Sequence, residues 1–348
     1  MIAAKPKYWL IVFVTVAALM LLAAYSIVTS SGKTEVDSGH RLVMGTFARV
    51  VVVAKDAKTA ETCIGAAFEE IENVDRLMSD YKEESEISKI NRLAAEKPVK
   101  VSKSTYEVLK KSIEFSRLSD GAFDVTVGPL VDLWRSAAKK DEPPTEQEIA
   151  ETKTRVGFEK LILDDRDSAV RFAVDGMRLD LGGIAKGYAI DRAVEVMQAR
   201  RAMGGMVDIG GDIRCFGVPA GKKDTWRIGL QDPNAERGTQ SRVLLTLQIE
   251  DKAVATSGDY QQFVVIGEKR YSHIISRGTG CGAEGLSSVT ILAEKAADAD
   301  ALATAVSALG VEKGLALVES LPDTEAILIT AAPEYDLIKT KGAGRFMR

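Results

Sequence analysis

The chain has 348 residues, of which 46% are hydrophobic and 28% are charged, and its formal net charge is -4. This length suffices for one large domain or two smaller ones with a sizeable core, and the lack of a basic tract argues against a nucleic-acid partner. Only two histidines are present, which excludes a His-rich metal site. The three cysteines, Cys63, Cys215 and Cys281, are widely spaced, which excludes a zinc ribbon and allows at most one disulfide.

The chain starts with an apolar stretch, Tyr8–Val28, that has 21 residues and no charge. As a helix it would reach about 30 Å, the thickness of a bilayer core. Lys5 and Lys7 precede it, so the positive-inside rule keeps the short tail in the cytoplasm and exports the body. The alternative is a cleaved signal peptide, whose apolar region usually has about 7–15 residues. We therefore expect residues 1–28 to be an uncleaved membrane anchor.

Residues 29–40 are polar and are expected to form a linker, with the globular part beginning near Arg41. Apolar residues at helical spacing predict helices, and short apolar runs predict strands. Thr145 and Glu148 have the spacing of a capping box that opens a helix. In chain order, we expect a strand at Ala48–Ala54, helices at Thr59–Met78, Ser102–Ser119 and Gly187–Arg200, strands at Val243–Ile249, Tyr260–Val265 and Ser288–Leu292, a helix at Ala296–Leu309 and a strand at Ala326–Ile329.

These elements follow no regular β–α repeat, and the sequence shows no internal repeat. An irregular mixture of this kind favours an α+β fold, with mixed sheets and packed helices, over a doubly wound sheet or a barrel.

Gly182 and Gly183 lie between an apolar strand expected to end at Asp180 and a helix with Lys186 in its first turn. Glycines at such a turn let the backbone approach a ligand, and a helix N-terminus with a lysine favours phosphate. The alternative is a tight turn capped by Asp180.

A second glycine pair, Gly210 and Gly211, is flanked by Asp208 and Asp212. An apolar strand that ends in acids and glycines indicates a bend around a ligand or a metal. The alternative is a strand bulge with surface carboxylates.

Asp300 and Thr304 are four residues apart in an expected helix, so their oxygens lie on one face, whereas Asp298 points elsewhere. A carboxylate and a hydroxyl are hard oxygen ligands that suit Mg²⁺. The alternative is an N-capping Asp on an Ala-rich helix.

His273 lies between a strand and a Gly-rich turn and could donate to a phosphate or carry a proton; the alternative is a structural histidine. The segment Gly121–Trp134 contains Asp124, which is a candidate ligand contact, but by its residues alone the segment predicts a buried loop.

Taken together, nine segments in order along residues 42–335 resemble the FAD:protein FMN transferase (ApbE) family. They are Met44–Val50, Met78–Asn91, Gly121–Trp134, Leu179–Asp191, Val207–Ile213, Trp226–Pro233, Ala253–Tyr260, His273–Gly280 and Ala299–Val306.

The resemblance implies a flavin transferase domain over residues 41–348 and assigns its site residue by residue. The implied metal ligands are Asp300, Thr304 and the backbone carbonyl of Gly183. The implied catalytic residues are His273 and Asp300. The positions that contact FAD are Met44, Tyr81, Ala122, Phe123, Asp124, Asp180, Lys186 and His273. Two positions depart from the family pattern: Ser276 and Arg277 replace an Asp-Pro pair, and Ala303 stands where some members have an Asp.

The resemblance further implies an Mg²⁺-dependent reaction in which FAD is cleaved, FMN is attached through a phosphoester to a Thr or Ser of an acceptor flavoprotein, and AMP is released. Two other functions stay open: a membrane-tethered protein that binds FAD without catalysis, and an FAD pyrophosphatase that gives FMN and AMP. With the anchor, we expect the enzyme at the inner (cytoplasmic) membrane, with its catalytic domain on the periplasmic side next to anchored acceptors.

Overall fold

An eight-stranded antiparallel sheet forms the centre of the molecule in the computed structural model, which describes residues 32–221, 225–234, 242–258 and 263–348. Valines and isoleucines alternate between its two faces, so each face has its own apolar core. In spatial order the strands are β1 (Thr34–Val43), β2 (Thr46–Ala54), β6 (Gly204–Ile209), β7 (Asp212–Gly217), β10 (Ala253–Gly258), β13 (Leu286–Ala293), β14 (Glu325–Thr330) and β15 (Leu337–Lys339).

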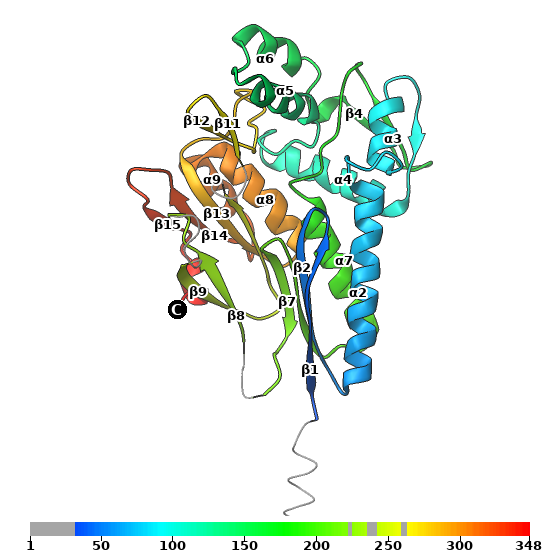
Figure 1. The fold of residues 1–348 in the computed structure, drawn as a ribbon, viewed down its shortest axis with the longest axis vertical. Coiled ribbons are helices and arrows are strands. Elements are labelled where there is room, and N and C mark those ends of the chain that lie inside the picture. The colour runs from blue at the N-terminus through cyan, green and yellow to red at the C-terminus, as the bar shows by residue number, and fades with distance from the viewer. Residues whose placement is uncertain (1–31, 222–224, 235–241, 259–262) are drawn as a thin grey trace, which may run out of the picture.

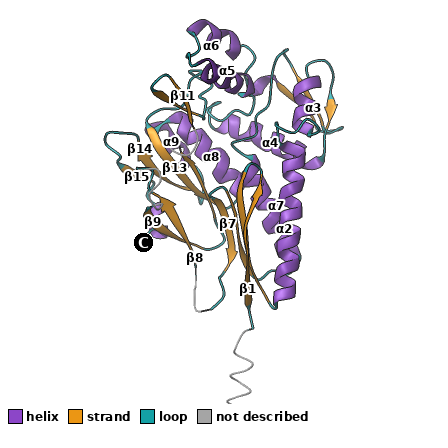
Figure 2. Ribbon diagram, in the orientation of Figure 1, coloured by secondary structure: helices purple, strands orange, loops and turns teal. Residues whose placement is uncertain are grey.

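Four helices cover one face of this sheet, and Figures 1 and 2 show them packed side by side along the strands. They bury the larger of the two cores, to which α2 contributes Phe68 and Ile71, at helical spacing. The helices are α2 (Ala57–Met78), α7 (Ala185–Ala199), α8 (Ala296–Leu309) and α9 (Val311–Glu319).

The opposite face is covered by a hairpin of β8 (Trp226–Gln231) and β9 (Val243–Ile249). Trp226 and Leu247 from this hairpin pack on Val53 and Cys215 from the sheet. The sheet therefore lies between a helical layer and a two-stranded β layer, which confirms the predicted α+β class.

Smaller elements gather at one end of the sheet, in the upper part of Figure 1. Among them the predicted capping box is confirmed, because Thr145 and Glu148 bond reciprocally at the start of α6. These elements are α3 (Glu86–Leu93), α4 (Lys103–Leu118), α5 (Gly128–Lys140), α6 (Glu146–Lys153), a sheet of β3 (Val99–Lys100), β5 (Ala169–Phe172) and β4 (Leu161–Asp164), and a hairpin of β11 (Phe263–Ile266) and β12 (Lys269–Ser272).

Most of the expected elements within the described residues are confirmed to within a few residues. The linker expected at residues 29–40 is wrong from Thr34 onward, because β1 pairs with β2 there. This polar segment forms an edge strand, which keeps most of its side chains in solvent. The strand expected to end at Asp180 is also wrong, since Arg178 makes only an isolated bridge to Val127.

Two expectations fall on other parts of the chain. The predicted anchor Tyr8–Val28 and residues 260–262 of the predicted strand Tyr260–Val265 lie outside the described residues. Within the described ranges, no helix has the length and apolar character that a membrane crossing requires. The three cysteines are free thiols, with Cys63 and Cys215 buried.

Candidate functional site

Gly183 and Thr304, two of the predicted metal ligands, lie against each other where the chain enters α7. A Cβ atom on Gly183 would stand 2.7 Å from Thr304 Oγ1 and 3.3 Å from a ring carbon of Phe123. This position therefore has no room for a side chain, while its backbone can approach the Thr304 hydroxyl closely. No described residue hydrogen-bonds that hydroxyl, so it is available to a ligand.

Asp300 is one helical turn before Thr304 on α8, and its side chain is buried with only 4% of the residue exposed. Its Oδ2 atom accepts a hydrogen bond of 3.0 Å from the backbone N–H of Gly187. Burial raises the pKa of Asp300 to about 7, with Lys186 opposing the rise and Asp212 adding to it. A cation beside this carboxylate would favour its charged form.

Lys186, in the first turn of α7, forms an ion pair with Asp212 at the start of β7. The second oxygen of Asp212 accepts from the Thr256 N–H at 3.1 Å. Burial lowers the pKa of Lys186, but the carboxylates of Asp212 and Asp300 outweigh it and raise the pKa above its usual value. The ammonium group therefore stays charged beside the predicted metal ligands.

The second glycine pair forms the tight turn between β6 and β7, rather than a bulge. Asp208 accepts from the Gly211 N–H at 2.9 Å and faces a cavity of about 250 Å³ between the sheet and the β8–β9 hairpin. That cavity belongs to the face of the sheet opposite Lys186. Of the two flanking acids, only Asp212 reaches the predicted site.

Asp180 and Tyr81, two predicted FAD contacts, are linked by Arg135 of α5. Arg135 donates to the Tyr81 hydroxyl at 2.8 Å, lies 5.4 Å from the centre of its ring, and approaches Asp180 Oδ2 to 3.9 Å. Tyr81 is 78% exposed, which is unusual for a large aromatic side chain, so its ring is available for stacking. The sequence offered no signal for Arg135, which is 54 residues from Tyr81.

Next to this group, Arg178 pairs with both Asp80 and Asp132, the first at 2.9 Å. Burial raises the pKa of Asp80, and the nearby Asp180 raises it further, while Arg178 lowers it. Three carboxylates thus lie near two guanidinium groups, which balance most of their charge.

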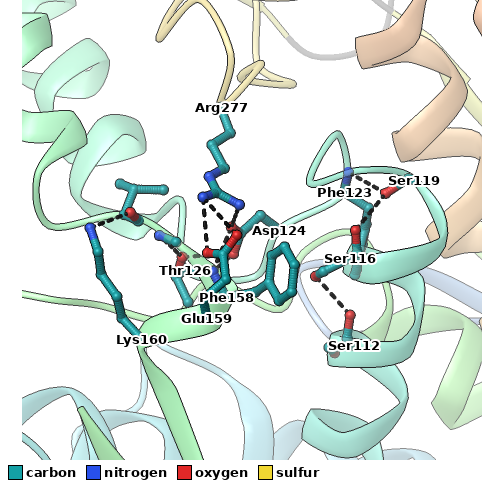
Figure 3. A network of polar contacts seen from close by, with 12 residues as sticks. Ser112, Ser116, Ser119, Phe123, Asp124, Thr126, Phe158, Glu159, Lys160 and Arg277 are labelled. Carbon is teal, nitrogen blue, oxygen red and sulfur yellow. Dashed lines mark hydrogen bonds and ion pairs between the residues drawn. The ribbon is translucent and has the colours of Figure 1, made fainter. Parts of the chain in front are cut away.

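Gly121–Trp134 was predicted to be a buried loop, and Ala122–Asp124 do lie in a turn with Phe123 and Asp124 buried. From Gly128 onward this prediction is wrong, because α5 begins there with Pro129 in its first turn. Asp124 is 5% exposed, and its oxygens accept from the Thr126 N–H and hydroxyl and from the Phe158 N–H. Burial raises the pKa of Asp124, and the Thr126 bonds and Arg277 oppose this rise. Its carboxylate is therefore engaged within the protein, so a ligand would meet mainly the backbone here (Figure 3).

His273 is exposed and directly follows β12, at the start of a loop that returns at Gly282. Met44 lies in the β1–β2 turn with a positive φ of 52°. In that turn region the Phe47 carbonyl accepts from the Gly210 N–H at 2.9 Å, which places the turn beside the bend between β6 and β7. Met44 therefore lies in a turn beside the β6–β7 bend, and His273 lies in an exposed loop, so neither belongs to the buried centre of the site.

Asp191, on the buried side of α7, was not predicted as a site residue. It accepts from the first two N–H groups of α8, those of Ala296 and Ala297, at 2.9 and 3.0 Å, and pairs with Arg214 at 2.7 Å. The helix that carries Asp300 and Thr304 is thus capped by a side chain from α7. An acid inside an apolar helical pattern was the only signal for it in the sequence.

The two helices also touch closely at Gly187, where a Cβ atom would lie 2.3 Å from the Ala296 carbonyl oxygen. Small residues and the Asp191 cap therefore hold α7 and α8 in one arrangement. This arrangement sets the spacing of Gly183, Asp300 and Thr304.

The donor set at this spot fits a hard divalent cation. It offers a carboxylate oxygen of Asp300 that no described residue hydrogen-bonds, the Thr304 hydroxyl and the Gly183 backbone. Mg²⁺ is typically held by one or two carboxylates and completes its shell with waters and substrate phosphates. The described residues contain no cluster of three or more His, Cys, Asp or Glu ligands, so a site built mainly from acids or histidines is not seen in them.

Comparisons with known proteins cover most of the chain. The model of the ApbE family matches residues 44–328. FAD:protein FMN transferases of Treponema pallidum and Vibrio cholerae are 33% and 34% identical, over 84% and 76% of this chain and 84% and 78% of theirs.

Solved structures give the same relationship. An ApbE protein from Thermotoga maritima superposes with a TM-score of 0.81 at 32% identity, covering 91% of this chain and 99% of that one. The flavin transferase ApbE from Vibrio cholerae gives 0.78 at 31% identity, covering 90% and 99%.

Proposed function

The chain belongs to the ApbE family, and from that premise we propose that it is an FAD:protein FMN transferase that uses a divalent cation, releases AMP and modifies a Thr or Ser of an acceptor flavoprotein. The observation that carries this proposal is that Gly183 lies directly against Thr304, which is one helical turn from the buried Asp300. The curated relatives are named for the same transfer.

The proposed reaction exchanges one phosphoester for another. The acceptor hydroxyl oxygen attacks the phosphorus of the FMN half of FAD, and the bond from this phosphorus to the bridging oxygen breaks, so AMP leaves. Asp300, Thr304 and the Gly183 carbonyl would hold Mg²⁺, which, when bound, supplies positive charge to the pyrophosphate.

The other residues bind and orient the substrates. Lys186 supplies a fixed positive charge next to Asp300, suited to a phosphate oxygen. Tyr81 offers an exposed ring for the flavin or adenine to stack on, while His273 takes the proton of the acceptor hydroxyl. The backbone of Ala122–Asp124 lines the same substrate site.

Three reactions can be separated in a single incubation of the protein with FAD, Mg²⁺ and an acceptor protein. Flavin fluorescence on the acceptor in a denaturing gel, together with an equal amount of AMP, is the expected result. Free FMN with AMP would instead identify a pyrophosphatase, and bound FAD without AMP would identify a non-catalytic FAD-binding protein.

The pKa of Asp300 makes cation binding depend on pH. Its carboxyl must be ionised to bind Mg²⁺, and its pKa of about 7 means that a proton competes with the metal below neutrality. We expect the apparent Mg²⁺ affinity to fall roughly tenfold from pH 8 to pH 6. Titration calorimetry at the two pH values measures this change, and equal affinities would contradict the assignment of Asp300.

We further propose that Tyr8–Val28 anchors the enzyme in the inner membrane with the catalytic domain on the periplasmic side. This rests on the length of the uncharged stretch and on the lysines before it. Protease added to spheroplasts should digest the catalytic domain, and the membrane fraction should retain a protein with its original N-terminus. Full protection, or a mature N-terminus beyond residue 28, would contradict this placement.

A further inference from the structure

We propose that Arg277 is a positioning residue. It holds the loop that carries His273 against Gly121–Asp124, the segment that contains the predicted FAD contacts Ala122, Phe123 and Asp124. The inference rests on the proposed function, in which His273 acts on the acceptor hydroxyl. Arg277 stands at one of the two positions where the sequence departs from the family pattern. The family pattern therefore does not predict the contacts that its side chain makes.

The Arg277 guanidinium bridges two carboxylates that come from different segments. One terminal nitrogen lies 3.3 Å from Asp124 Oδ2, and the other lies 2.9 and 3.1 Å from the two oxygens of Glu159. The guanidinium carbon is 5.3 Å from the centre of the Phe158 ring. Figure 3 shows the Arg277 side chain extending from its loop toward Asp124 and Glu159.

The space for this guanidinium is provided by two glycines. A Cβ atom on Gly121 would lie 2.7 Å from one of its terminal nitrogens, and one on Gly157 would lie 3.3 Å from the other. Both glycines have positive φ, of 77° and 144°, which side chains disfavour. The local backbone therefore fits a guanidinium at this position.

The ion pair between Arg277 and Asp124 is strong because the Asp124 carboxylate is buried. This carboxylate accepts three hydrogen bonds from Thr126 and Phe158, but these donors carry no charge. Arg277 supplies the opposite charge within reach, which a buried carboxylate needs. Losing Arg277 leaves Asp124 without its charged partner and frees the loop.

At its other side, the loop is held at two further points. The Gly280 carbonyl accepts from the Trp134 indole at 2.8 Å, and the Gly278 carbonyl accepts from Lys153. Both of these contacts lie beyond Arg277 in the chain. Ile275 also packs with Trp134 in an apolar cluster. Arg277, four residues from His273, adds an ion pair to these contacts of the loop.

The segment Gly121–Asp124, which Arg277 contacts, also adjoins the predicted metal site. The Phe123 ring packs against Gly183, and the Val125 carbonyl accepts from the Asp180 N–H at 2.8 Å. Arg277 thus connects the His273 loop to the residues that contact the metal and FAD. Its contacts set the distance between the proton acceptor and the reacting phosphate.

The test compares Arg277→Met with wild type and with Arg345→Met. Arg345 is a matched control, because it also pairs with a carboxylate, Glu325, at 3.5 Å and covers a ring, that of Phe346, at 4.8 Å, in the C-terminal segment. We expect Arg277→Met to lower kcat for FMN transfer about 10- to 100-fold, because misplacing a reacting group by about 1 Å can cost about 100-fold in rate. The KM for FAD should change much less, Arg277→Lys should recover part of the rate, and Arg345→Met should behave as wild type.

A second readout does not depend on activity. The amides of Ser276, Gly280 and Ala283 are hydrogen-bonded within the loop, and their hydrogen exchange should be at least about tenfold faster in Arg277→Met. If Arg277→Met does not fold, Glu159→Gln gives the same test, because the Glu159 side chain is 54% exposed. Unchanged exchange overturns the proposal, and so does an unchanged kcat or a rise in KM alone. If wild type transfers no FMN, the proposed function fails, and the exchange result alone decides whether Arg277 holds the loop.

Discussion

Replacing Asp300 with Asn is expected to lower the rate of FMN transfer by at least about 100-fold. Loss of a residue that only supports a metal ligand typically costs about 10- to 100-fold, so loss of a charged ligand should cost no less. Asn keeps an oxygen that can accept the Gly187 N–H, so the α7–α8 contact should survive. The measurement is kcat for AMP release and for acceptor flavinylation at saturating FAD and Mg²⁺.

Asp298 provides the matched control on the same helix. It lies two residues earlier and pairs with Lys111 at 2.5 Å, outside the proposed metal site. Asp298→Asn should therefore keep nearly the full rate. A folded Asp300→Asn protein with a rate within tenfold of wild type would contradict the assignment of Asp300 as a metal ligand.

Replacing Asp191 with Ala is expected to lower the free energy of unfolding by about 3–5 kcal/mol, the usual cost of removing one member of a buried ion pair. Asp191 is 6% exposed, and its loss leaves Arg214 buried without a counter-charge. It also leaves the first two N–H groups of α8 without their acceptor. Urea denaturation measures the change in the free energy of unfolding.

Glu195→Ala is the control for this substitution. Glu195 lies one turn further along α7 and pairs with Arg192 at 2.8 Å on the surface, where ion pairs contribute at most about 1 kcal/mol. A loss below about 1 kcal/mol in Asp191→Ala would show that Asp191 does not hold the two helices together. Weaker Mg²⁺ binding should accompany the expected loss, because α8 carries Asp300.

Local patterns in the sequence were enough for most of the elements and for part of the site. Asp300 and Thr304 could be placed on one helix face because they are one turn apart, and helical periodicity predicted α8 with its observed bounds. The polar strand β1 was missed because an edge strand exposes most of its side chains and so lacks an apolar pattern.

Contacts between distant segments could not be predicted in this way. The pairing of Lys186 with Asp212 and of Asp124 with Arg277 depends on how strands and loops come together, across 26 and 153 residues of chain. The fit of Gly183 against Thr304 is likewise a property of helix packing. The resemblance to a family supplied Lys186, Asp124, Gly183 and Thr304. Their partners Asp212 and Arg277 could be identified only from the structure.

The most direct test of the proposed metal centre is diffraction at the manganese absorption edge, from crystals grown with FAD and with Mn²⁺ in place of Mg²⁺. We expect one anomalous peak within about 2.5 Å of the Gly183 carbonyl oxygen, an Asp300 carboxylate oxygen and Thr304 Oγ1, with a phosphate of FAD completing the shell. A peak among Asp80, Asp132 and Asp180, or no peak with FAD bound, would contradict the account.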